Sequence, residues 1–203
     1  MRFDTLTEMQ ADALRETGSI GAGHAATALS QLVGHAVSID VPTLEVLGVG
    51  DVPDLFGGPE VLVVGVHVRL LGDIGGSMLF MAERASALAL VDMMHARPVG
   101  TAKAFSADEE ALVSHVASIL MAAYLAAVGR LADVSLLPAR ASSTLDMAGA
   151  IMDAVTADAA MRADVALLLK TRFYGSDTSV DSYLFFLLDP TGLGVLLGRL
   201  GVA

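Results

Sequence analysis

The sequence predicts an α+β fold in which long helices pack on one antiparallel β-sheet. Segments with helical periodicity alternate with short β-rich runs, and glycine-containing turns join those runs into hairpins. The order helix, strand, hairpin and helix occurs twice, which indicates an internal duplication over residues 1–98 and 105–203 of one domain that spans residues 1–203. A duplicated helix–strand–hairpin unit is typical of helices that pack on the faces of a single antiparallel sheet.

The first half begins with a helix predicted over Thr5–Val33, where apolar residues recur at helical spacing. Three glycines within Gly18–Gly23 weaken it by roughly 1 kcal/mol each relative to alanine, so we expect another element or a ligand to approach this backbone closely. Pro42 interrupts the strand predicted over Val37–Leu47, which favours an edge or a bulge. The other predicted elements of this half are a helical turn at Asp51–Gly58, two hairpin strands at Val61–Leu71 and Ser77–Ala82, and a helix at Glu83–Ala96.

A linker predicted over Val99–Phe105 leads to the second half. Ser106 and Glu109 form a capping box that opens a helix predicted to run to Leu131. Its apolar run Val116–Val128 has 13 residues, whereas a membrane-spanning helix needs ~20, so a buried core helix without membrane insertion is expected. The later predicted elements are a strand at Val134–Leu137, a helix at Leu145–Ala163, two strands at Val165–Tyr174 and Ser179–Leu188, and a helix at Thr191–Leu200.

Composition excludes several classes of function. The formal net charge of −11 argues against nucleic acid as a partner and against docking on anionic membranes, because both need basic surfaces. The absence of cysteine excludes disulfides, thiolate metal sites and cysteine nucleophiles. The five histidines lack metal-ligand spacing, so no metal site is expected. The N-terminus lacks the basic and apolar regions of a signal peptide, which predicts a cytoplasmic protein.

Three polar residues of the first predicted helix share one face. Asp12, Glu16 and Ser19 are spaced i, i+4 and i+7, and a helix places them within about 40° of one line on its surface. One interpretation is an ordinary solvated acidic face, and the other is a polar strip presented to a partner. The glycine-rich run that follows slightly favours the second interpretation.

Four motifs together resemble the CheC family of chemotaxis proteins. The first runs from Asp12 through Glu16 and Ser19-Ile-Gly-Ala-Gly-His-Ala, with Pro42 after it. The others are Asp54-Leu-Phe-Gly-Gly, Gly72-Asp-Ile-x-Gly-Ser and Leu145-Asp-Met-x-Gly-Ala. They are collinear over essentially the whole chain, and the resemblance is closer to CheC than to FliY, which carries an extra C-terminal domain, or to the shorter CheX. It implies a duplicated α+β fold and the phosphorylated response regulator CheY as partner.

The resemblance also implies a catalytic site in each repeat. In the family a glutamate pairs with a lysine of the regulator, and an asparagine carboxamide holds the water that attacks the aspartyl phosphate. In this chain Asp12, Glu16 and Pro42 match the pattern, but Ser19 replaces the asparagine. The chain itself needs no cofactor or metal on this account, because the regulator supplies the phosphoaspartate and its Mg²⁺.

The second repeat has lost the pattern altogether. Its aligned positions are Ala111, His115 and Ser118, and Ala141 stands at the proline position. A serine hydroxyl lies closer to its own backbone than a carboxamide and lacks the paired donor and acceptor, and a small misplacement can cost ~10²-fold in rate. We therefore expect docking through Glu16 with weak or absent hydrolysis. The alternative is an active phosphatase in which Ser19 holds the water.

The family also binds the receptor deamidase CheD through a segment that Leu145–Ala150 resembles. This implies that Asp146, Met147 and Gly149 contact CheD; the other interpretation of Asp146 is an acidic cap on a helix dipole. Because this motif is kept while the catalytic ones are degraded, a binding role is favoured over catalysis. An acidic domain that has kept neither partner is the third interpretation. The two repeats can pack on each other, so a monomer suffices.

Overall fold

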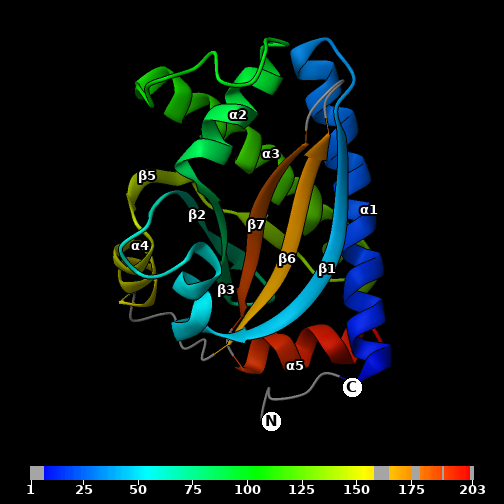
Figure 1. The fold of residues 1–203 in the computed structure, drawn as a ribbon. Helices are drawn as coiled ribbons and strands as arrows, with labels where there is room; N and C mark the ends of the chain where they lie inside the picture. The colour runs from blue at the N-terminus through cyan, green and yellow to red at the C-terminus, as the bar shows by residue number, and fades with distance from the viewer. Residues whose placement is uncertain (1–6, 158–164, 175–178, 189, 202–203) are drawn as a thin grey trace.

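The computed structural model describes residues 7–157, 165–174, 179–188 and 190–201, and it has the predicted α+β fold (Figure 1). The strands are β1 (Ser38–Gly48), β2 (Leu62–Gly72), β3 (Gly76–Glu83), β4 (Leu136–Pro138), β5 (Ser142–Met147), β6 (Val165–Tyr174) and β7 (Ser179–Leu188). The helices are α1 (Glu8–Val33), the 3₁₀ helix η1 (Val49–Phe56), α2 (Arg84–Met94), α3 (Ala107–Ala132), α4 (Ala148–Thr156) and α5 (Pro190–Arg199).

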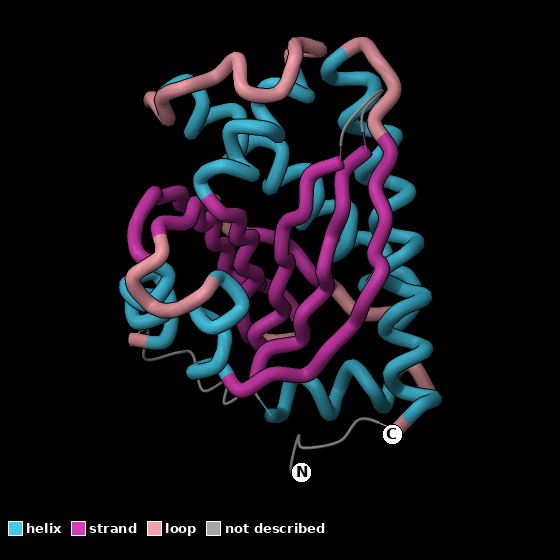
Figure 2. The backbone as a smooth tube through the Cα atoms, in the orientation of Figure 1, coloured by secondary structure: helices cyan, strands magenta, loops and turns pink. Residues whose placement is uncertain are grey.

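The strands form one antiparallel sheet that both halves of the chain build together. Its order is β1-β6-β7-β3-β2-β4, and β5 also pairs with β2. The first strand of each half therefore pairs with the hairpin of the other half: β1 with β6, and β4 and β5 with β2. The two hairpins meet where β3 pairs with β7 in the middle of the sheet. Figure 2 shows the long strands running side by side across this shared sheet.

Helices cover the sheet on two faces. On one face α1 and α3 pack together over a large core that includes Leu29, Phe80 and Tyr124, and α2 and α5 add to it. On the other face α4 and η1 cover a smaller core around Phe56 and Phe185. This arrangement leaves one long side of α1 exposed along its length (Figure 1).

Two glycines of α1 are explained by the elements that pack against them. A Cβ added at Gly21 would lie 2.9 Å from the Tyr124 Cα, and one at Gly18 would lie 3.2 Å from a Leu169 methyl carbon. Gly23 is exposed and has no such neighbour within 4 Å. The close approach that the glycine-rich run predicts is therefore made by a neighbouring element rather than by a ligand.

Several local predictions are confirmed. Ser106 and Glu109 form the capping box of α3. The register of β1 against β6 shifts between Asp40 and Thr43, which is the bulge that Pro42 predicts, and β1 is an edge strand. Among the described residues α3 is long and apolar enough to cross a membrane, but half of its most apolar stretch is buried inside the fold, as in a core helix.

The helix predicted over Leu145–Ala163 is wrong at its start. Residues Ser142–Met147 form β5, and the helix α4 begins only at Ala148. Pairing with Leu62–His67 of β2 overrides the local helical pattern of this segment. The end of the predicted helix, residues 158–163, lies outside the described residues.

Candidate functional site

The first candidate site is the exposed face of α1. A capping box formed by Thr7 and Gln10 starts this helix, and its buried side packs on α3 and the sheet. Asp12, Glu16 and Ser19 all lie on the opposite, exposed side. We call these three residues the polar strip; their spacing predicts the shared face, and the structure places them on it.

The two carboxylates of the polar strip differ in their surroundings. The Asp12 Oδ1 lies 2.5 Å from Nη1 of Arg15, with the two side chains 72% and 46% exposed. Within the described part of the chain, the side chain of Glu16 takes part in no hydrogen bond or ion pair. The Glu16 carboxylate is therefore available to a cation of another molecule.

The Ser19 hydroxyl is turned toward its own helix. Its Oγ donates to the Arg15 carbonyl oxygen at 3.1 Å. In α3, Ser118 Oγ donates in the same way to the Ser114 carbonyl oxygen at 2.7 Å. A hydroxyl has one proton to donate, so each serine offers only its oxygen lone pairs to a water or a partner.

The corresponding face of α3 has no carboxylate at the matching positions. Ala111 and His115 are exposed there, and Ser118 is half-buried. Ala141 lies between β4 and β5, half-buried against the core. The acidic residues of α3 are confined to its first turn. There their negative charge interacts favourably with the positive end of the helix dipole. The position of α3 that matches Glu16 therefore carries the imidazole of His115 and no carboxylate.

The strand β1 lies beside α1 at the residue that precedes Pro42. This residue, Val41, is buried, and a Cβ added at Gly18 of α1 would lie 3.8 Å from a Val41 methyl carbon. Pro42 thus marks the bulge of β1 at the level where this strand meets α1.

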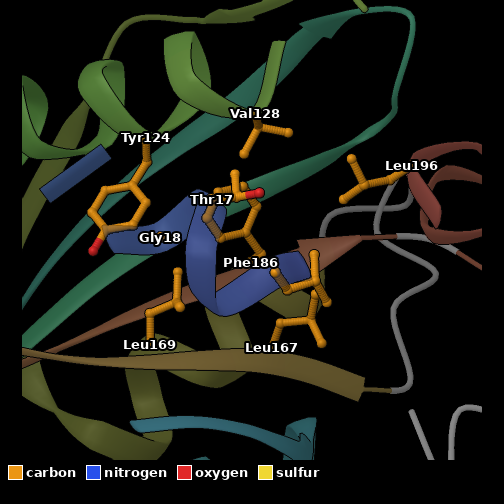
Figure 3. A pocket seen from close by; sticks show the side chains of 9 residues that line it. Thr17, Gly18, Tyr124, Val128, Leu167, Leu169, Phe186 and Leu196 are labelled. Atoms are coloured by element: carbon orange, nitrogen blue, oxygen red, sulfur yellow. The ribbon is translucent and has the colours of Figure 1, made fainter. Parts of the chain in front are cut away.

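A small apolar cavity lies on the buried side of α1, where Thr17 and Gly18 help to line it (Figure 3). It measures about 20 Å³, which is room for about one water molecule and far below the roughly 300 Å³ of a small-molecule site. The residues that line it are Leu14, Thr17, Gly18, Tyr124, Val128, Leu167, Leu169, Phe186 and Leu196. This cavity is therefore too small to hold a small-molecule substrate.

The second candidate site is the junction of β5 and α4. Asp146 is exposed, and its Oδ1 accepts a hydrogen bond of 2.8 Å from the Met147 N–H at the start of α4. Met147 is 43% exposed, and Leu62, its direct cross-strand neighbour on β2, is 51% exposed. Sequence reasoning missed Leu62, because only the register of β2 and β5 places it beside Met147.

Gly149 has a structural reason to be glycine. Its N–H donates to the Pro59 carbonyl oxygen at 2.9 Å, and an added Cβ would lie 2.9 Å from the Pro59 Cβ. The close approach of Pro59 to α4 thus explains why residue 149 is glycine, and no contact with another protein is needed to explain it. The same sequence motif supplies both an exposed carboxylate and an internal packing contact.

The two remaining motifs also have structural roles. Gly57 and Gly58 end η1 with φ of 93° and 129°, which favours glycine. A Cβ at Gly72 would lie 2.1 Å from the Ser135 carbonyl oxygen, and Asp73 Oδ2 accepts a 2.7 Å hydrogen bond from the Ser135 N–H. These contacts join the β2–β3 hairpin to the second half of the chain.

Comparison with known proteins places these sites in context. Residues 9–46, which hold the polar strip and Pro42, match the model of the CheC-like family. Over 205 residues the chain is 28% identical to the protein named CheY-P phosphatase CheC of Bacillus subtilis (strain 168), covering 99% of this chain and 98% of that protein. The chain is similar to CheC.

Two further matches agree with this resemblance. The flagellar motor switch phosphatase FliY of the same Bacillus subtilis strain is 35% identical over 91 residues, which cover 45% of this chain and 23% of FliY. The solved structure of Thermotoga maritima FliY superposes with a TM-score of 0.73 at 15% identity, covering 97% of this chain and 98% of that chain. At that identity the superposition bears on the fold, and it confirms the predicted CheC-like fold.

Proposed function

We propose that this CheC-like protein binds the phosphorylated response regulator CheY through the polar strip of α1 and hydrolyses its aspartyl phosphate weakly or not at all. One observation carries the proposal: a Glu16 carboxylate that pairs with none of the described residues stands beside Ser19, whose hydroxyl proton is donated to its own helix. The name of the relative CheY-P phosphatase CheC supports CheY as the partner.

Hydrolysis requires a water oxygen to bond to phosphorus while the bond from phosphorus to the aspartyl oxygen breaks. The leaving carboxylate stays on the regulator, and a water proton passes to solvent. In this proposal Glu16 pairs with a lysine of the regulator and fixes the orientation of the complex. Ser19 accepts a hydrogen bond from the water but cannot donate one, so the water is held less well than by a carboxamide.

No residue of this chain attacks phosphorus in the proposed reaction. The Mg²⁺ that offsets phosphoryl charge belongs to the regulator, and the chain brings no cofactor. Phosphoryl transfer depends mostly on positioning and on charge stabilisation, which an exposed helix face can supply. A cytoplasmic location follows from such a partner.

The alternative function is an active phosphatase. The Ser19 oxygen can still accept a hydrogen bond, Ser19 and Glu16 are both exposed, and a relative over the whole chain is named a phosphatase. On this alternative the acceptor alone is enough to align the water. The rate of hydrolysis separates the two functions.

We further propose that the β5–α4 junction binds the deamidase CheD. The exposed pair Asp146 and Met147 supports this, since a carboxylate and an apolar side chain stand together at the start of a helix. This second function uses residues of a different face from the polar strip. The two partners therefore need not compete for the same side chains.

The decay of phosphorylated CheY tests the first proposal. We expect decay with an excess of this protein to be at most a few-fold faster than without it, while Glu16→Lys abolishes binding of the regulator. Glu60→Lys, a matched change at an exposed loop glutamate, serves as the control. Fast catalytic turnover would establish the alternative, and equal binding by the wild type and Glu16→Lys would overturn the docking role.

A further inference from the structure

We propose that Arg15 recognises the phosphoryl group of the bound regulator, an inference that rests on the proposed docking of the polar strip. Arg15 is the only lysine or arginine in α1. Its side chain is 46% exposed and reaches Asp12, and its carbonyl oxygen accepts the Ser19 hydroxyl. The guanidinium therefore stands on the same exposed side of the helix, one turn before Ser19.

The other groups of the polar strip cannot supply what a phosphoryl anion needs. Asp12 and Glu16 repel it, and the Ser19 proton is already donated within the helix. A guanidinium carries five N–H donors and binds phosphate oxygens through strong charge-assisted hydrogen bonds. Its contact with Asp12 at 2.5 Å through Nη1 leaves further donors of the group for an incoming anion.

The ion pair with Asp12 does not prevent this role. The pair is solvent-exposed and spaced i, i+3 on the helix surface, and such pairs are stabilised only slightly in water. A doubly charged phosphoryl group competes well for the same guanidinium. Asp12 then acts as the group that holds Arg15 in place until a phosphorylated partner arrives.

The ratio of two dissociation constants tests this inference. Binding of the full-length chain is measured for unphosphorylated CheY and for CheY carrying beryllofluoride, a stable mimic of the phosphoryl group. We expect Arg15→Gln to lower the preference for the beryllofluoride form by about tenfold, with little change for the unphosphorylated form. Arg15→Lys should restore part of it, and Arg140→Gln, at an exposed arginine outside α1, should leave the preference unchanged.

The variant Asp12→Asn distinguishes the effect of the Arg15 charge from the effect of the Arg15–Asp12 ion pair. If Arg15 contacts the phosphoryl group, removing its competitor should keep or raise the preference for the beryllofluoride form. An equal fall in Asp12→Asn and Arg15→Gln would instead mean that the pair merely stabilises the helix, and would overturn the inference.

Two outcomes with the other variants distinguish the inference from the proposed function. An unchanged preference in Arg15→Gln, with normal binding by the wild type, overturns the role of Arg15 and leaves docking intact. A wild type that binds neither form of CheY overturns the proposed docking and the role of Arg15 with it. Circular dichroism of each variant confirms that the helix is retained.

Discussion

At Ser19 the hydroxyl proton is donated to the Arg15 carbonyl, 3.1 Å away within the same helix. A longer carboxamide at this position would extend past the backbone and offer both a donor and an acceptor to a water. On the proposed function, the difference between serine and asparagine at this position therefore decides how well the water is held.

Ser19→Asn is expected to raise the rate of phospho-CheY decay by about 10- to 100-fold, because the water gains a second anchoring hydrogen bond. Phosphate release measured at a fixed concentration of the protein checks this. Ser118→Asn is the matched control, since the face of α3 around it holds Ala111 and His115 but no glutamate. Equal rates for Ser19→Asn and the wild type would contradict any working site on α1.

Asp92 is a second residue whose surroundings decide its role. It is fully buried, and its carboxylate accepts hydrogen bonds from Arg97 and from the Thr101 and Ala102 N–H groups. Burial raises the pKa of this carboxyl, but the hydrogen bonds from Ala102, Arg97 and Thr101 together outweigh burial and hold the pKa below its ordinary value. The predicted linker Val99–Phe105 is thus anchored to α2.

A lowered pKa in the folded state means that the ionised Asp92 stabilises the fold above the pKa of the unfolded chain. That stability is lost as pH falls through the lowered folded pKa. Asp92→Asn is therefore expected to lower the free energy of unfolding at pH 7 by about 3 kcal/mol, and by less near pH 3. Urea unfolding at both pH values measures this, with Asp153→Asn on the exposed side of α4 as control. A loss that is the same at both pH values would contradict the ionic role.

At the scale of elements, the contact of α1 with α3 depends on the absence of side chains. Gly21 lies against the backbone of Tyr124, whereas Gly23, two residues later, faces open space. Both positions have helical backbone, so they differ in packing and not in conformation.

Opposite effects are expected from the same substitution at these two glycines. Gly21→Ala should lower the free energy of unfolding by about 1–3 kcal/mol, because the added methyl overpacks the helix interface. Gly23→Ala should raise it by about 0.5–1 kcal/mol through helix propensity. Urea unfolding of the two variants is the measurement, and stabilisation by both would show that α1 and α3 can move apart freely.

The β5–α4 junction gives a binding prediction at the same scale. Asp146→Lys should abolish capture of CheD, because it reverses the charge beside the exposed Met147. Glu45→Lys, at an exposed glutamate on β1, is the control. If Asp146→Lys captures as much CheD as the wild type does, the proposed binding of CheD at this junction is contradicted.

The same junction illustrates the limit of reading elements from sequence. Helical periodicity and caps predict α1 and α3 well, because those signals are local. The strand β5 is held by pairing with β2, more than 70 residues earlier, and no local pattern reports that contact. Likewise, the spacing of Asp12, Glu16 and Ser19 predicts their shared exposed face, but the direction of the Ser19 hydroxyl and the contact of Arg15 with Asp12 required coordinates.

At the scale of the whole molecule, the exchange of first strands couples the two halves. Because β1 completes the sheet beside β6, and β5 and β4 complete it beside β2, neither half covers its own apolar surface. The large core draws on both long helices and on both hairpins.

The chain is expected to unfold in one cooperative transition for this reason. Hydrogen exchange should give the same opening free energy for the amides of β3 in the first half and β7 in the second, because these strands pair at the centre of the sheet. Two separate transitions in urea, or weaker protection of one strand, would contradict this coupling.

The shared core places different demands on the two sides of α3. Its inner residues, among them Tyr124, fill the common interior, while Ala111 and His115 are exposed on its outer side. Substitutions at such exposed positions can remove functional groups without destabilising the fold. The fold nevertheless depends on the helix itself, which supplies part of the common core. On the proposed function, α3 is thus retained for the shared core alone, because each half of the chain completes the sheet and the interior of the other.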